Sequence, residues 1–294
     1  MKKILSLLIV LQIIYANNSF TSFKVPFFSN SASLSNNISC VNNGSASNFT
    51  NPSLLNYIKN NEISINYQKL YQDMFSYQLG YGTKLGDIAY SLNIMNTKIS
   101  DIEIRKRPGD PEGEFSYNVI VTNVGLAYKL NGNISLGAAF NYANQQILVD
   151  DESAYFVNFG LFYKNLIDNL DYGFSINNLG STNGLRNSKS ELPVSFSTGF
   201  LYNIRKFNAE KIDLNLLYEL EKIKNESLIK NKIAFEAKYD NLINLRMGYI
   251  FNNDVYNLTF GLGLMFNNYE LSYSYLPVKY SLGDNHSIGI KINW

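Results

Sequence analysis

Apolar and polar residues alternate with a period of two from about residue 63 to the end of the chain. In residues 287–294 every second residue is large and apolar, and the residues between are mostly small or polar. Because successive side chains of a strand point to opposite faces, this segment predicts a strand with one apolar and one polar face. A strand that ends at an aromatic residue, here Trp294, is typical of the closing strand of a bacterial outer-membrane barrel.

The same alternation would also fit a soluble β-sandwich, so the remaining segments decide between the two folds. With the last strand, fourteen segments share the pattern, the others being 63–67, 75–81, 88–94, 124–128, 134–142, 155–163, 172–176, 194–200, 212–220, 233–239, 245–249, 258–266 and 271–275. Tyr falls near the ends of many of them, as an aromatic girdle requires. The sequence therefore predicts an all-β fold, a transmembrane antiparallel β-barrel of about fourteen strands with an N-terminal plug or hatch segment.

The connections between these segments support a barrel whose two ends both lie in the periplasm. In such a barrel the connections after even-numbered strands are short and those after odd-numbered strands are longer. Even-side turns include 131–133, 240–241 and 267–268, and odd-side connections include 99–115, 180–192, 223–231 and 276–285. On this interpretation only the first odd-side turn, near Gln72 and Asp73, is short.

The first residues predict export. A charged start at residues 1–3, an apolar run at 4–14 and the small residue Ala16 are typical of a secretory signal peptide, which we place at residues 1–16. The run is shorter than the ~20 residues of a membrane helix. Cys40 lies too far downstream to be a lipid-anchored first residue of the mature chain and has no disulfide partner. We expect location in the outer membrane of a Gram-negative-type cell.

Residues 17–60 interrupt the alternation. Ser, Asn and Phe dominate this stretch, and Pro52 lacks the amide hydrogen that a central strand needs. A flexible arm and a plug folded into the barrel mouth both fit. The predicted organisation is a signal peptide at 1–16, a periplasmic N-terminal hatch or plug segment at 17–60 and the outer-membrane barrel at 61–294.

Charge and composition argue against several functions. The net charge is +1 with no acidic or basic run, so nucleic acid is not an expected partner. One His and one Cys cannot form a metal site, and no nucleophile has a readable matching base. We interpret His286 as a solvated rim residue. We expect no catalytic, cofactor-binding or metal-binding residue, no cofactor and no enzymatic activity.

Charged residues of the polar faces concentrate in the last six predicted strands: Asp213, Glu219, Lys232, Glu236, Lys238, Arg246, Glu270 and Lys291. If the turn between two of these strands centres on Asn241, Glu236 and Arg246 lie directly opposite each other. Such a pair contributes roughly 0.2–1 kcal/mol to stability. Stiffening of the wall and contact with a ligand are both open roles for this predicted lumen charge pair.

Four segments resemble motifs of FadL-like outer-membrane barrels, in particular the PorV/PorQ group. Residues 48–54, which include Asn51 and Pro52, resemble the "NPAGL" signature before the first strand, and residues 175–180 with 191–193 resemble an "NLG … LP" junction. Residues 245–249 resemble the "LRaGY" strand, and residues 283–288 resemble the last-strand motif. The Gly-rich stretch of the family is replaced at residues 30–36 by a segment without glycine. The resemblance spans residues ~30–294 and implies fourteen strands.

The resemblance implies two different functions. FadL-like proteins pass or bind small hydrophobic solutes, and PorV/PorQ relatives act in type IX secretion as shuttles or anchors for secreted cargo proteins. A purely structural outer-membrane protein is a third alternative. We favour transport, because a lumen lined by small residues leaves space and residues 17–60 can line a site within it. Expected partners are outer-membrane lipid, the barrel assembly machinery, and either hydrophobic small molecules or secreted cargo.

Overall fold

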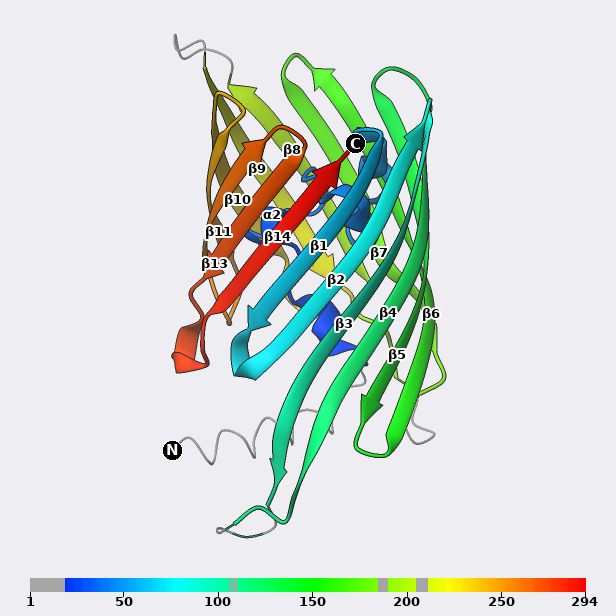
Figure 1. The fold of residues 1–294 in the computed structure, drawn as a ribbon, viewed down its shortest axis with the longest axis vertical. Helices are drawn as coiled ribbons and strands as arrows, with labels where there is room; N and C mark the ends of the chain where they lie inside the picture. The colour runs from blue at the N-terminus through cyan, green and yellow to red at the C-terminus, as the bar shows by residue number, and fades with distance from the viewer. Residues whose placement is uncertain (1–18, 106, 108–109, 185–189, 205–210) are drawn as a thin grey trace.

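The computed structural model describes residues 19–105, 107, 110–184, 190–204 and 211–294. Within these residues fourteen antiparallel strands form a closed barrel in which sequence neighbours pair and β14 pairs with β1 (Figure 1). The predicted fold class is confirmed. The signal peptide predicted at 1–16 lies outside the described residues. No helix in the described part of the chain is long and apolar enough to span a membrane.

The strands are β1 (Asn61–Leu70), β2 (Met74–Leu85), β3 (Ile88–Ile104), β4 (Gly113–Lys129), β5 (Ile134–Ile147), β6 (Asp150–Ile167), β7 (Leu170–Thr182), β8 (Ser195–Ile204), β9 (Ile212–Ile223), β10 (Lys230–Tyr239), β11 (Ile243–Phe251), β12 (Leu258–Phe266), β13 (Tyr269–Leu276) and β14 (Asn285–Asn293). The short helices are η1 (Thr21–Lys24), α2 (Ser29–Ala32), η2 (Gly44–Phe49), η3 (Pro52–Tyr57), η4 (Tyr71–Asp73) and η5 (Lys279–Ser281). We call the end of the barrel where odd-numbered strands finish the outer rim, and the opposite end the inner rim.

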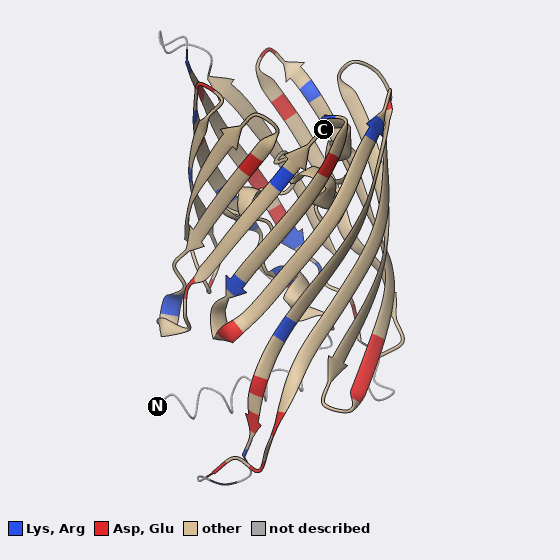
Figure 2. Cartoon of the chain, in the orientation of Figure 1, with Lys and Arg blue, Asp and Glu red and all other residues tan. Residues whose placement is uncertain are grey.

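The alternating sequence places apolar side chains outside the barrel and polar ones inside. In β3, Leu92 is 57% exposed, whereas its neighbours Ser91 and Asn93 are buried. Most of the strand surface seen in Figure 2 carries no charge, and charged residues gather toward strand ends and hairpin tips. A soluble protein would bury an apolar face of this size, whereas an outward apolar band is what a membrane barrel presents to lipid.

Barrel closure brings the two ends of the strand series together. Asn61 and Trp294 exchange two backbone hydrogen bonds of 3.2 and 3.1 Å. The Trp294 ring lies 6.2 Å from the ring of Tyr81 on β2. The structure thus places the predicted C-terminal aromatic residue at the seam between the first and last strands, and its role in assembly stays a prediction.

One expectation about the connections is wrong. Two residues, Leu148 and Val149, separate β5 from β6, so the turn after β1 is not the one short connection at the outer rim. The strands of the β3–β4 and β5–β6 hairpins continue beyond the apolar band as paired ribbons. There the outward residues become polar, and Asn96 donates a hydrogen bond of 2.7 Å to Asn118 on the adjacent strand. The alternation of apolar and polar residues therefore stops at the edge of the apolar band, whereas the backbone pairing between adjacent strands continues beyond it.

Residues 19–60, which we call the plug, lie inside the barrel (Figure 1). Their side chains are mostly buried, with Asn48 and Asn51 at 0% exposure. The plug contains η1, α2, η2 and η3 joined by irregular segments. Because short helices and irregular backbone leave many amide groups unpaired, the Ser- and Asn-rich sequence supplies side-chain partners for them.

Candidate functional site

Buried amide side chains hold the plug against the half of the wall formed by β1–β7. Asn93 and Asn123 lie opposite each other on β3 and β4 and are joined by a hydrogen bond of 3.0 Å. Asn48 of the plug donates a second hydrogen bond of 3.0 Å to the same Asn123 oxygen. On β6, Asn158 donates to the Asn48 carbonyl oxygen at 2.7 Å. The plug therefore completes a carboxamide network that crosses several strands.

The predicted hatch motif, Asn51 and Pro52, lies in close contact with the wall. The Asn51 side chain accepts a hydrogen bond from the Ser53 amide and caps η3, where Pro52 occupies the first turn. A Cβ atom on Gly137 would lie 2.3 Å from the carbonyl carbon of Pro52, and one on Gly160 would lie 1.9 Å from Asn51 Oδ1. The backbone of Pro52 therefore leaves no room for a larger residue at position 137, and a larger residue at position 160 would require the Asn51 side chain to move. The sequence analysis did not single them out, although both fall at inward positions of the alternation.

Charged side chains hold the opposite side of the plug. Glu236 and Arg246 lie opposite each other on β10 and β11, and Arg246 Nε is 2.9 Å from Glu236 Oε1. Arg246 also donates to Asn30 Oδ1 of the plug at 2.9 Å, and Asn30 Nδ2 donates to Glu270 Oε1 at 2.8 Å. Lys291 lies 3.2 Å from Glu270. The structure thus brings the predicted lumen pair into a network that ends on the plug.

A second ionic cluster binds the plug nearer the outer rim. Lys232 Nζ lies 2.8 Å from Glu219 Oε1 and donates to the carbonyl oxygen of Asn36 at 2.6 Å. Glu219 accepts hydrogen bonds from the backbone amides of Ile38 and Ser39 at 2.9 and 2.7 Å. Removing two charges from water is costly, and these additional hydrogen bonds offset part of that cost.

The sequence analysis missed inward carboxylates outside the last six strands. Glu62 on β1 is 4% exposed, and its Oε1 accepts a hydrogen bond of 2.7 Å from the Ser45 amide of the plug. Glu152 on β6 is fully buried and accepts hydrogen bonds from the hydroxyls of Ser19 and Ser190. Their inward position could have been read from the alternation, but their plug partners could not.

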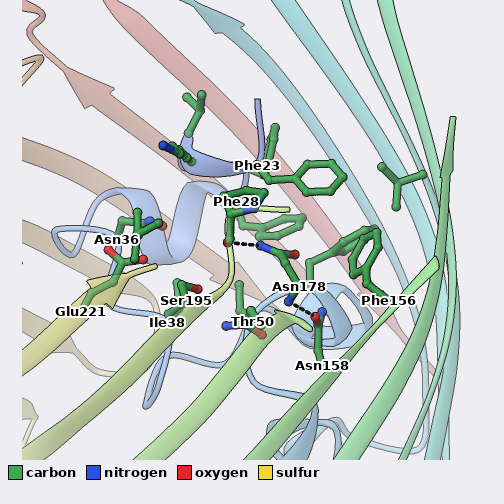
Figure 3. Close-up of a pocket in the computed structure, with 18 of the residues that line it drawn as sticks. Phe23, Phe28, Asn36, Ile38, Thr50, Phe156, Asn158, Asn178, Ser195 and Glu221 are labelled. Carbon is green, nitrogen blue, oxygen red and sulfur yellow. Dashed lines mark hydrogen bonds between the residues drawn. The ribbon is translucent and has the colours of Figure 1, made fainter. Parts of the chain in front are cut away.

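An apolar pocket of about 60 Å³ lies where the plug meets the wall. In Figure 3, Phe23, Phe28 and Phe156 lie toward one end of this pocket, and Asn36 and Glu221 lie at the other. The rings of Phe23 and Phe156 are 5.4 Å apart, so plug and wall contribute to one aromatic cluster. The lining is completed on the wall by residues that include Met95, Val121 and Ile223.

The wall beside the pocket is irregular. The β6–β7 register shifts between Val157 and Phe159, and Asn178 has a positive φ of 62°. Asn tolerates this left-handed backbone conformation better than most residues do. The Asn178 amide donates to Asn158 Oδ1 at 2.8 Å, and its side chain donates to the Pro193 carbonyl oxygen at 3.1 Å, which Figure 3 shows as dashed lines. Side chains thus replace part of the backbone pairing here.

Two larger cavities lie on opposite sides of the plug. The outer one, of about 550 Å³, is lined by residues such as Tyr71 and Tyr256 and shares Lys24 and Glu221 with the apolar pocket. The inner one, of about 510 Å³, is lined by residues that include Tyr57 and the Glu236–Arg246 pair. The apolar pocket therefore adjoins the outer cavity, and the plug lies between it and the inner cavity.

The plug also contains two titratable groups whose pKa values are raised by burial. Burial raises the pKa of Tyr57 to about 12, with a further contribution from the charge of Asp171. Burial, followed by the charge of Glu219, raises the pKa of the Cys40 thiol well above its usual range. Within the described residues no group of three or more His, Cys, Asp or Glu side chains is arranged to bind a metal ion.

Comparisons with known proteins give structural but no sequence matches. No protein-family model matches the chain, and no curated protein sequence matches it. The solved toluene transporter TodX of Pseudomonas putida aligns with a TM-score of 0.67 at 13% identity, covering 91% of this chain and 98% of that one. The Ralstonia pickettii toluene transporter TbuX and a Pseudomonas aeruginosa FadL homologue each align with a TM-score of 0.57 at 12% identity, again covering 91% and 98%. The chain therefore has the FadL-like fold.

Proposed function

We propose that this protein binds small hydrophobic solutes and passes them across the outer membrane. The observation that carries the proposal is the apolar pocket between plug and wall, with its aromatic side chains, which adjoins the outer cavity. A barrel of fourteen strands has an interior wider than wall side chains alone can fill. Here the plug occupies that interior and adds the aromatic side chains of Phe23 and Phe28 to a lumen whose wall carries mainly polar and charged side chains.

The volume of the pocket shows that side chains must move before a solute can bind. A dry cavity of about 150 Å³ accepts one benzene molecule, whereas this pocket has about 60 Å³. A monoaromatic solute therefore enters only when plug side chains such as Phe23 and Phe28 move aside. Because each ring packs mainly by apolar contact, a hydrophobic solute that replaces those contacts compensates for part of their loss.

Four further assignments belong to the same proposal. Residues 1–16 direct export, residues 17–60 form a hatch segment that includes the plug, and residues 61–294 form the barrel that the assembly machinery inserts through the strand ending at Trp294. Glu236 and Arg246 position the plug through Asn30 rather than contacting solute. The fold of toluene transporters supports transport as the function of this chain, and membership of the PorV/PorQ group stays a prediction.

Uptake of radiolabelled toluene by cells of a porin-poor host tests the proposal. We expect expression of the full chain to increase uptake, and Val121→Phe to return uptake to the level of the empty vector because the new ring fills the pocket from the rigid wall. Ile120→Phe is the matched control, since this neighbouring residue faces lipid and is 40% exposed. Equal uptake by Val121→Phe and wild type would contradict the proposal. Retention of secreted proteins in the periplasm after deletion, with uptake intact, would support a cargo shuttle instead.

A further inference from the structure

An irregularity in the wall brings two consecutive carboxamides to the apolar pocket. In a regular strand, neighbouring residues point to opposite faces of the sheet. On β7, however, Asn177 and Asn178 both line the pocket. The register between β6 and β7 shifts at this place, and Asn178 has a positive φ of 62°. Such bulges redirect side chains and are common beside functional sites.

The two carboxamides differ in how their polar atoms are paired. The Asn178 side chain donates to the Pro193 carbonyl oxygen at 3.1 Å, so the wall holds it in place. Asn177 is only 2% exposed, and its Nδ2 donates to Ser175 Oγ at 3.3 Å. Asn177 Oδ1 is buried and has no hydrogen-bond partner in the part of the chain that the structure describes. The wall therefore presents one buried acceptor to the pocket without a donor for it.

Other acceptors that line the pocket are engaged by the protein itself. Asn158 Oδ1 accepts a hydrogen bond of 2.8 Å from the Asn178 amide. The Glu221 carboxylate lies 3.0 Å from Lys232 Nζ. Asn177 Oδ1 differs from both because it has lost its hydrogen bonds to water without gaining a protein donor, which is unfavourable. A solute that donates a hydrogen bond to this oxygen removes the loss, whereas a hydrocarbon does not.

The remaining lining indicates which solute can carry that donor. Phe23 and Phe28 of the plug and Phe156 of the wall line the same pocket, and such rings pack favourably against another aromatic ring. Ligand sites commonly combine an apolar lining with a few polar groups that fix orientation. Here the wall supplies a fixed acceptor, and the plug supplies rings that move aside when the solute enters.

We infer that the pocket selects monoaromatic solutes with one neutral hydrogen-bond donor, such as the hydroxyl of phenol, and that Asn177 Oδ1 accepts this hydrogen bond. The inference rests on the proposed function, because it specifies the solute class of the same pocket. Toluene has nearly the same shape as phenol, with a methyl group in place of the hydroxyl. Toluene therefore enters the pocket but leaves Asn177 Oδ1 without a partner.

Isothermal titration calorimetry of the full chain in detergent tests the inference, with phenol and toluene as probes. Val121→Phe, in which the new ring fills the pocket, measures the background from partition into detergent. We expect Asn177→Leu to bind phenol about tenfold more weakly than wild type and to bind toluene at least as tightly. Comparing one solute between two proteins cancels its hydration, because the same solute leaves water in both cases.

Asn141→Leu is the matched control for loss of a buried carboxamide. Asn141 is fully buried on β5, and its Oδ1 also has no partner among the described residues, but it lies outside the set of residues that line the pocket. Its substitution should leave the ratio of phenol to toluene affinity unchanged. Asn177→Ser, which is too short to replace the carboxamide oxygen, should weaken phenol binding as leucine does and serves if Asn177→Leu does not fold. Heat-modifiable migration on a gel verifies folding.

The outcomes separate this inference from the proposed function. If Val121→Phe abolishes toluene binding and the Asn177 variants keep the wild-type ratio of phenol to toluene affinity, the inference is wrong and the proposed function stands. An equal change of this ratio in Asn141→Leu would also overturn the inference. If neither solute binds wild type above the Val121→Phe background, the inference and the proposed function are both wrong.

Discussion

Arg246 on β11 donates a hydrogen bond of 2.9 Å to Asn30 of the plug, a residue 216 positions earlier in the chain. The same guanidinium pairs with Glu236 at 2.9 Å. One side chain therefore links the barrel wall to the segment that occludes it. Because the planar guanidinium donates in several fixed directions, it can serve both partners without changing its conformation.

We expect Arg246→Met to loosen the plug. Removal of the guanidinium leaves Glu236 buried with Lys238, 3.3 Å away, as its remaining cation, and deprives Asn30 of a donor. Breaking a buried ion pair costs about 3–5 kcal/mol, less where water enters the lumen. Planar-bilayer recordings should show higher conductance than wild type. Lys211→Met, which breaks the exposed Lys211–Asp240 pair at 3.1 Å, should change conductance little.

A double variant refines this prediction. Glu236→Leu/Arg246→Leu removes both charges, so no uncompensated carboxylate remains beside the plug. Its conductance should lie closer to wild type than that of Arg246→Met. Wild-type conductance in Arg246→Met would show that the pair does not position the plug.

Gly137→Val should expel η3 from its position against the wall. A Cβ atom at this position would lie 2.3 Å from the backbone of Pro52, and backbone cannot rotate away as a flexible side chain can. Limited proteolysis of the folded protein should cut the plug faster than in wild type. Gly132→Val is the control, because no atom lies within 4 Å of a Cβ atom there. Equal cleavage of the two variants would contradict the predicted contact.

Cys40 should resist alkylation in the folded protein. The thiol is 6% exposed, Cys40 Sγ lies 3.4 Å from the Gly199 carbonyl oxygen, and burial raises the pKa of the thiol. Since the thiolate is the reactive form, raising the pH from about 7 to about 9 should accelerate labelling of an exposed thiol but not of Cys40. Maleimide labelling followed by mass spectrometry measures both rates.

Two variants complete the labelling experiment. Leu130→Cys in a Cys40→Ala background provides the exposed reference thiol, because Leu130 is 56% exposed. Asn51→Ala should accelerate labelling of Cys40, since Asn51 Nδ2 donates to the carbonyl oxygen of Ser39 at 2.6 Å and holds this part of the plug. Rapid labelling of Cys40 in the wild-type protein would mean that the plug opens readily.

The sequence by itself determined the strands, their outward face and some of their register. Period-two alternation is a local property, and it gives the direction of each side chain without knowledge of the rest of the molecule. The opposition of Glu236 and Arg246 followed in the same way, because a tight turn near Asn241 fixes which residues of the two strands meet. The ends of the strands were predicted less accurately, because the strands of hairpins such as β5–β6 stay paired beyond the point where the apolar pattern stops.

Only the tertiary structure decided where the plug lies and what it contacts. The partners of Asn30, Asn48 and Pro52 are inward wall residues far along the chain, and no local pattern marks them. Closure of the barrel determines which wall residues come close together in the lumen. The apolar pocket therefore depends on the combined curvature of many strands. The alternation establishes that a side chain points inward, but the position of its partner depends on how the whole sheet closes, which no single segment encodes.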